Sequence, residues 1–362
     1  MANKTYKIRL YPNAEQIKKL EFWLSACCEL YNAALEERIG AWRTNRVQIN
    51  YLAQNKQLSE IKRERPEFAE INSHVLQDVL MRLEKAFKAF FRRVSSGDAP
   101  GFPKFKSYRH FDSFSFPNTR YHLEHNKLCV SRLGNLSLGS DRPIEGVLKT
   151  CTIKREINHW YACLVVEFEP RPLPQREEAI ALKFSLERFL TSDRGENFDY
   201  PQYYQEAEKR LRVLQRTLAR RKKGSARWHK AMQQVQKLHR RIFNQRKHFQ
   251  HELSTKIVRE NQVIAVEKLN LKKMISDGQP AHLNKKVTDA GVALFMNKLE
   301  YKAEFAGRKY LKTDPAGNVQ VCECGESVPK TIKTRVHDCP KCGAGTSRQM
   351  MAARVVKKRA AG

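Results

Sequence analysis

The run Pro-Arg-Pro-Leu-Pro-Gln at 170–175 divides this sequence into two parts with different hydrophobic patterns. Three prolines in six residues fix φ and remove backbone donors, so neither a helix nor a central strand continues through the run. We therefore interpret this run as a linker and place a domain boundary there.

The part before the linker begins with KTYKIRLY at 4–11, whose alternation predicts a strand. Asn13, with Gln16 three positions later, can cap a helix that we expect to reach about Trp42. Ser73 can cap a second amphipathic helix, which the run GDAPG at 97–101 breaks.

From that break to about residue 170, short alternating runs between turns predict several strands. A single strand, then helices, then many strands favours a small barrel with a helical insertion. After the linker, the patterns predict a strand pair over 179–198, one or two long helices over 204–259, a buried strand in 261–271 and a helix over 288–310. This order is typical of an RNase H-like core, although the pattern alone does not name that fold. The expected class is therefore α+β and multidomain.

Charge restricts the partners of such a chain. It has 68 Lys and Arg against 38 Asp and Glu, a net charge of +30, and a polyanion best neutralises that self-repulsion. Fifteen Lys and Arg and no acidic residue lie between Lys209 and Gln250. A merely basic helix pair is the alternative, but a solvated helix face normally mixes both signs, so we favour helices that face phosphates.

No run of 18 apolar residues occurs and the N-terminus does not resemble a signal peptide, so no membrane partner is expected. We expect a cytoplasmic, bacterial, nucleoid-associated protein. In a reducing compartment, the five cysteines outside the C-terminal region are expected to be buried thiols: Cys27, Cys28, Cys129, Cys151 and Cys163.

Several segments, in this order, resemble the TnpB-like family of transposon-encoded RNA-guided nucleases: YKIRLYPNAEQ, GFPKFKS, TLARRKKGSARW, LHRRIFNQRKHFQHELSTKIVREN, IAVEKLNLKKM, LEYKAEFAGRKY and CPKCG. The resemblance implies a wedge β-barrel (1–12 and 101–170) with a helical recognition insertion (13–100). It further implies an RNase H-like RuvC domain (171–313 and 344–362) interrupted by a zinc-ribbon-like module (314–343). It implies a guide RNA and double-stranded target DNA as partners and no small-molecule substrate, because in such proteins base pairing reads the sequence.

Family RuvC sites hold two metal ions with three carboxylates. By resemblance, the first acidic position is Lys183 here, the second is Glu267, and the third, in a segment resembling Asp-Arg-Asp-x-Asn-Ala-Ala, is Gln349. These three side chains sum to zero charge, so we expect no catalytic Mg²⁺, no nuclease activity, and an ion pair between Lys183 and Glu267. A displaced acid, Glu187 above all, with Asp193 and Glu196 following it, is the route by which weak cleavage would survive.

The remaining cysteines form two pairs, Cys322-Glu-Cys324 and Cys339-Pro-Lys-Cys342, each followed by glycine. Paired cysteines with this spacing are typical of a structural zinc ribbon, although the first pair is one residue short. The alternatives are a relict ribbon that binds zinc weakly or not at all, and an altered site completed by another ligand such as His337.

Phenylalanine and lysine alternate in GFPKFKS and FDSFSFP, a pattern suited to base stacking beside phosphate. For Phe114 and Phe116 a core position is the better interpretation, whereas Lys104 and Lys106 are candidates for backbone contacts. By resemblance, the DNA motif beside the target would contact Tyr51, Ser73 and Gln77. A polar helix surface is the alternative for Gln77, which can also read adenine.

The candidates for contact with the guide–target duplex are Arg220, Arg221, Lys222, Lys223, Arg240 and Arg241. The sequence therefore predicts a nuclease-dead, guide-directed repressor resembling the TldR branch, which blocks RNA polymerase by occupying DNA. The alternatives are a weak metal-dependent RNA-guided nuclease and a nucleic-acid binder that needs no RNA.

Overall fold

The computed structural model describes residues 1–140, 143–185, 188–199, 202–269, 291–331 and 334–361. It divides into two compact units, Met1–Glu169 and Pro170–Gly362, and the boundary between them in the sequence is the start of the proline run. No helix among the described residues is both long and apolar enough to cross a membrane.

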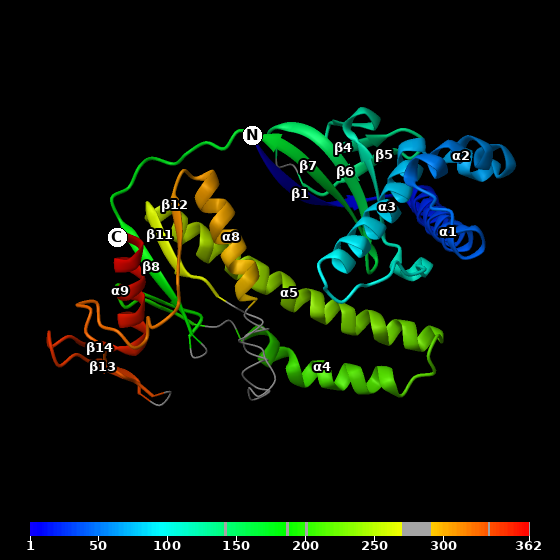
Figure 1. Ribbon diagram of the computed structural model, residues 1–362. Coiled ribbons are helices and arrows are strands. Elements are labelled where there is room, and N and C mark those ends of the chain that lie inside the picture. The colour runs from blue at the N-terminus through cyan, green and yellow to red at the C-terminus, as the bar shows by residue number, and fades with distance from the viewer. Residues whose placement is uncertain (141–142, 186–187, 200–201, 270–290, 332–333, 362) are drawn as a thin grey trace. The chain divides into compact units, whose positions relative to one another are not determined.

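The first unit is built on a seven-stranded antiparallel sheet in the order β2-β6-β7-β1-β5-β4-β3. Strands β1, β4, β5, β6 and β7 of this sheet are labelled in Figure 1. The strands are β1 (Ala2–Tyr11), β2 (Ser113–Pro117), β3 (Tyr121–Glu124), β4 (Lys127–Val130), β5 (Gly134–Leu138), β6 (Val147–Glu156) and β7 (His159–Phe168). The edge strands β2 and β3 are joined by the 3-10 turn Asn118–Arg120, and Phe116 meets Tyr121 across it with ring centroids 5.5 Å apart. The expected barrel is therefore a nearly closed sheet, in which β3 is a strand that the sequence patterns did not predict.

Three helices follow β1 and precede β2: α1 (Ala14–Asn45), α2 (Tyr51–Glu64) and α3 (Ser73–Ser95). Asn13 caps α1 as predicted, since its side chain accepts from the Gln16 N–H while Gln16 bonds back to the Asn13 N–H. The prediction for α3 is wrong by one residue, because Asn72 is the cap and Ser73 is the first helical residue. Helix α2 was not predicted, because it buries only Gln54 and Leu58 and so has little hydrophobic periodicity.

One continuous core joins the sheet to α1 and α3. Phe114 and Phe116 lie in it, 0% and 2% exposed, so the core interpretation of these two residues is confirmed. Four of the five scattered cysteines are buried, Cys163 is half-buried, and all five are free thiols.

The second unit has a five-stranded sheet in the order β10-β9-β8-β11-β12, with β11 parallel to both neighbours. Its strands are β8 (Ala179–Phe184), β9 (Leu190–Ser192), β10 (Asn197–Phe198), β11 (Val263–Glu267) and β12 (Lys309–Thr313). The predicted helix over 288–310 is α8 (Val292–Phe305); its C-terminal residues instead form β12, after a turn at Gly307 with φ +68°. Residues 288–290 and 270–271 of the predicted elements lie outside the described residues.

The two faces of this sheet carry different helices (Figure 1). Ile180, Leu182, Ile264 and Val266 pack with residues of α5 (Ala226–Glu260) and α8, whereas Ala181 and Ala265 pack with Val356 of α9 (Arg348–Ala361). Successive strand residues point to opposite faces, so Lys183 and Glu267 belong to the face that α9 covers. Small alanines under α9 allow this helix to lie close to the strands.

Candidate functional site

Lys183 and Glu267 meet at the carboxyl edge of the sheet. Strands β8 and β11 run parallel with Leu182 opposite Val266, so the next residues along each strand are brought to the same edge. The Lys183 Nζ forms an ion pair with Glu267 Oε2, and the two side chains are 13% and 2% exposed. The predicted ion pair is therefore confirmed.

The other carboxylate oxygen of Glu267 is also engaged. Asn318 Nδ2 donates to Glu267 Oε1 at 2.8 Å and also to the Asp314 carbonyl at 3.1 Å. Glu267 is 4% exposed and Asn318 1%, so Glu267 is a buried carboxylate held by one cation and one amide. Asn318 was not predicted from the sequence, because nothing in the local pattern distinguishes a buried asparagine from a loop residue.

Gln349 lies in the first turn of α9 and is half-buried. In the described part of the chain, no hydrogen bond joins its side chain to Lys183 or Glu267. A different acid on this sheet is buried: Asp193, just after β9, accepts from the Ala181 N–H at 2.8 Å and pairs with Lys357 of α9 at 2.7 Å. Glu196 is exposed, and Glu187 lies outside the described residues.

The second feature is a basic helix hairpin, α4 (Tyr203–Ala219) and α5, joined by the turn 220–225 (Figure 1). Leu211 from α4 packs against Val235, Leu238 and Ile242 from α5, which leaves the outer faces of α4 and of the first half of α5 exposed. The C-terminal part of α5 packs on the sheet. Gly224 sits at the turn with φ +88° and open space around it, so the chain reverses there without steric cost.

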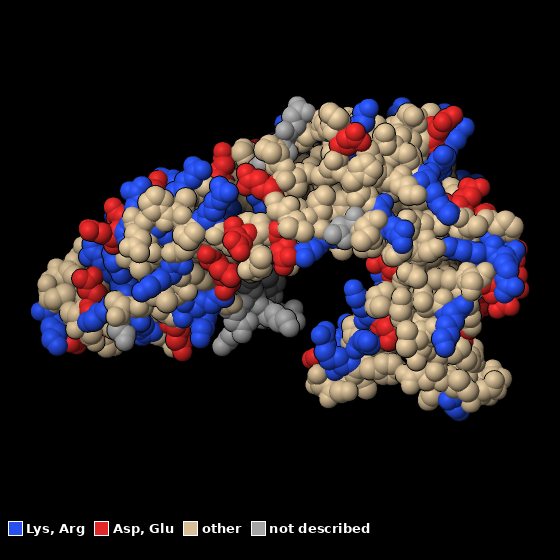
Figure 2. Space-filling view, turned by 90° about the horizontal axis from the view of Figure 1, so that it is seen from above, with Lys and Arg blue, Asp and Glu red and all other residues tan. Residues whose placement is uncertain are grey.

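The structure places the predicted cations on this hairpin. The turn carries four exposed cations, Arg220, Arg221, Lys222 and Lys223. The sequence has no Asp or Glu between Lys209 and Gln250 that could neutralise them. Arg241 is exposed and Arg240 is half-buried. Figure 2 shows Lys and Arg spread over the visible face of the molecule, with fewer Asp and Glu among them.

A shallow groove of about 330 Å³ lies between the two helices. The groove is lined by three cations, Arg210, Lys237 and Arg241, and by the apolar side chains of Leu214 and Leu238. Three cations around an open groove favour an anionic ligand with spaced charges, such as a phosphate backbone.

The residues expected to read DNA are in the first unit. Tyr51 and Ser73 are the first residues of α2 and α3, and Gln77 is half-buried one turn into α3. The Ser73 hydroxyl accepts a hydrogen bond from Lys62 at 2.6 Å, so it would have to be released before contacting a base. Lys104 and Lys106 are exposed on the loop before β2.

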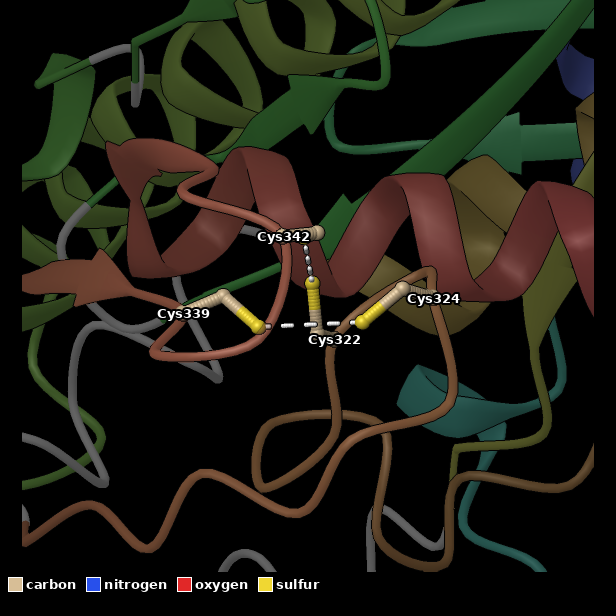
Figure 3. Close-up of side chains that lie close together, drawn as sticks. All are labelled: Cys322, Cys324, Cys339 and Cys342. Atoms are coloured by element: carbon tan, nitrogen blue, oxygen red, sulfur yellow. Dashed lines mark hydrogen bonds between the residues drawn. The ribbon is translucent and has the colours of Figure 1, made fainter.

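Four cysteines converge in the C-terminal region (Figure 3). Cys322 Sγ lies 3.6 Å from Cys342 Sγ, Cys324 Sγ lies 3.7 Å from Cys339 Sγ, and all four sulfurs are within 4.8 Å of one another. Four thiolates at about 2.3 Å from a tetrahedral zinc ion are about 3.8 Å apart, so the four cysteines fit such an ion. The shorter spacing of the first pair does not prevent this convergence.

The cysteines differ in their readiness to ionise. The backbone N–H of Cys342 lowers the pKa of the Cys339 thiol to about 7, whereas burial raises the pKa of the Cys322 thiol to about 12. His337 is fully buried with both ring nitrogens lacking a hydrogen-bond partner among the described residues, and burial lowers its pKa. It does not belong to the group of converging ligand atoms, so the alternative in which His337 completes the site is not supported.

Three family models match the chain. A probable transposase model (OrfB of IS605) matches residues 163–277, a Cas12f1-like TNB domain matches 293–356, and a helix-turn-helix domain matches 1–46. The last region folds as β1 followed by the single helix α1.

Two curated relatives match nearly the whole chain. A putative RNA-guided DNA endonuclease from Streptomyces pristinaespiralis is 30% identical over 97% of this chain and 88% of its own length. The putative RNA-guided DNA endonuclease InsQ of Escherichia coli K12 is 27% identical over 90% of this chain and 84% of its own. The structure of a Cas12f1-sgRNA-target DNA complex includes a chain with the same fold, with a TM-score of 0.62, 14% identity and 98% of each chain covered.

These names contradict the prediction that the chain is not an enzyme, because both relatives are named endonucleases. The charge count at 183, 267 and 349 is therefore insufficient to exclude catalysis, and of the displaced acids named from the sequence Asp193 is buried next to the same sheet.

The chain is 30% identical to a putative RNA-guided DNA endonuclease over 97% of its length, and the transposase and TNB models match it in order. This chain therefore belongs to the TnpB/IS605 OrfB family.

Proposed function

We propose that the chain binds a guide RNA and a double-stranded DNA target that matches the guide, and that the bound complex represses transcription where the target overlaps a promoter. The observation that carries this proposal is the α4–α5 hairpin, with fifteen cations and no acid between Lys209 and Gln250. The relatives named RNA-guided DNA endonucleases support it.

The hairpin suits a duplex that is held but not read. Its exposed cations can neutralise phosphates of an A-form heteroduplex of about 20 base pairs, while base pairing with the guide supplies the sequence specificity. Arg210, Lys237 and Arg241 would follow the backbone along the groove between the helices. Changing the guide RNA should therefore move such a protein to a different DNA target.

Each part of the chain has its own role in binding the guide RNA and the target DNA in this proposal. The near-closed sheet (1–12 and 101–170) and the helices inserted in it (13–100) contact a short DNA motif beside the target, through Tyr51, Ser73 and Gln77. Lys104 and Lys106 contact the backbone. The RuvC-like sheet with α4 and α5 (171–313 and 344–362) holds the duplex, and the module at 314–343 contains the cysteines.

A structural zinc ion is part of the proposal. Cys322, Cys324, Cys339 and Cys342 would hold it, and the ion would supply the cross-link that fixes their loops in place of a hydrophobic core. Among the described residues of this module, the buried apolar side chains are Cys322 and Cys339, which pack with Met351 of α9.

The proposal is tested by sequencing the RNA that copurifies with the chain and then replacing its guide segment. A footprint on DNA should move to the new matching sequence while the adjacent motif stays the same, and a promoter reporter should be repressed only with its matching guide. A footprint that stays at the original site without RNA would overturn the proposal and favour RNA-independent binding.

The second candidate function is guide-directed DNA cleavage, which the names of both relatives favour. Buried Asp193 and Glu267 are the described carboxylates of the sheet that such chemistry would use, and each is paired with a lysine. Cutting of a matched duplex in Mg²⁺ or Mn²⁺ that is lost in Glu267→Gln or Asp193→Asn would establish it. Binding without cutting under the same conditions would leave occupancy as the function.

A further inference from the structure

We infer that the loop 101–107, together with the C-terminal end of α3, forms a stacking platform for unpaired nucleobases, with Phe105 as its principal contact. This inference deepens the proposed function, because it rests on nucleic acid being the partner and adds a single-stranded segment to the duplex held by the hairpin.

Exposed aromatic side chains gather here. Phe91, Phe102, Phe105 and Tyr108 are 48%, 46%, 56% and 38% exposed, although large aromatic rings normally gain stability by burial. Phe91 on α3 and Phe102 on the loop adjoin in space through Phe87 and Phe90, and Phe105 and Tyr108 follow Phe102 within six residues of the chain. Exposed rings concentrated in this way indicate a binding surface rather than scattered surface residues.

Two of these rings, Phe91 and Phe102, pack against other aromatic rings. Phe90 lies between Phe91 and Phe102, with ring centroids 5.2 Å and 5.3 Å away, and Phe87 contacts the same two rings. Tyr108 is covered by Arg155, whose guanidinium lies 5.0 Å from its ring. Phe105 differs, because no other ring contacts it in the part of the chain that the structure describes.

The loop that presents Phe105 is fixed at both ends. Pro103 is buried and Phe102 packs in the ring cluster. On the other side, the Lys106 N–H donates to Asn32 Oδ1 at 2.7 Å, and Asn32 Nδ2 donates back to the Lys106 carbonyl at 2.8 Å. A ring held on a fixed loop loses little conformational entropy on binding, so its exposure favours recognition.

Charge identifies the occupant. Between residues 85 and 110 there are seven Lys and Arg and a single acid, Asp98. An apolar protein surface would not require that charge, and a paired duplex would not offer a base face to Phe105. Rings flanked by cations suit a single strand, in which bases stack on the rings while phosphates meet Lys104 and Lys106.

The test uses fluorescently labelled single strands that do not match any guide, in three forms: a DNA oligomer, the same sequence as RNA, and an abasic strand of equal length and charge. Binding is measured with the RNA-loaded chain. A stacked base contributes about 1–3 kcal/mol, so the wild type should bind the strands with bases about 5- to 150-fold more tightly than the abasic strand.

Phe105→Ala should remove most of that preference and leave the slope of log K against log salt unchanged, because stacking releases no counterions. Lys104→Ala is the matched control on the same loop; it should weaken binding of all three strands and reduce the slope by about 0.7. Phe105→Leu keeps an apolar side chain without a ring and should behave as Phe105→Ala.

An unchanged preference for bases in Phe105→Ala, in a variant whose melting temperature equals that of the wild type, overturns the inference. Because no probe matches a guide, this result would not bear on RNA-guided targeting. Conversely, a platform that binds single strands would persist if the footprint failed to follow the guide.

Discussion

Lys183→Met provides the sharpest test of the energetics at the carboxyl edge of the second sheet. In the wild type, the Glu267 side chain is 2% exposed. It forms an ion pair with Lys183 and accepts a hydrogen bond from the Asn318 amide. Methionine has nearly the volume of the lysine stem but leaves the buried carboxylate without its counter-charge. Removing one partner of a buried pair costs about 3–5 kcal/mol, chiefly because the other charge remains desolvated.

The assay is a double-mutant cycle in urea, monitored by a probe on the second unit. Lys183→Met should lower the free energy of unfolding by about 3 kcal/mol, which corresponds to a melting temperature lower by about 10 °C for a domain of this size. Lys183→Met combined with Glu267→Gln should recover to within about 1 kcal/mol of the wild type, because glutamine can still accept from Asn318 and carries no charge.

Lys312→Met is the matched control. Its partner is Glu300, the two side chains are 43% and 44% exposed, and the pair lies in the same unit. Exposed pairs contribute about 0–1 kcal/mol. If Lys183→Met costs no more than Lys312→Met, or if the double variant is as unstable as the single one, the account of Glu267 as a buried charge held by Lys183 is refuted.

Three further predictions concern the rest of the chain. Replacing Arg220, Arg221, Lys222 and Lys223 by Gln should weaken RNA and heteroduplex binding and flatten its salt dependence, more than the same change at four exposed lysines elsewhere (Lys18, Lys127, Lys309 and Lys341); equal losses in gel shifts would remove the special role of the hairpin. Zinc content measured by mass spectrometry should be about one ion per chain, and Cys339→Ser or a strong chelator should abolish it and lower the melting temperature; an intact ribbon fold in metal-free protein would contradict this. Burial, with Lys302 and Lys298 nearby, lowers the pKa of His251 to about 4 from an ordinary value of 6.5, so the unfolded chain takes up a proton first and stability should fall as the pH falls from about 6.5 to about 4. In His251→Gln, thermal melts should show a weaker loss over that window, and an identical pH profile would exclude His251 as a contributor.

Sequence patterns alone determined much about this protein because they report local periodicity and total charge. The alternation of β1, the capping box of Asn13 and Gln16, the buried stripe of α3 and the proline run all follow from contacts within a few residues. The excess of Lys and Arg predicted a polyanionic partner without any coordinates. Segments with weak periodicity were missed for the same reason: α2 buries little, and β3 and β12 are only four and five residues long.

Tertiary structure alone decided which distant residues meet. Parallel pairing of β8 with β11 brings Lys183 to Glu267 across 84 positions, and only the fold adds Asn318 to that carboxylate and Lys357 to Asp193. The sequence showed two cysteine pairs but could not show that the shortened first pair still brings four sulfurs within 4.8 Å. Likewise, GFPKFKS showed alternating rings and cations, whereas the burial of Pro103 and the bonds from Asn32 decide that Phe105 faces solvent. Each of these depends on long-range packing, which sets burial and therefore the strength of every charge and ring contact.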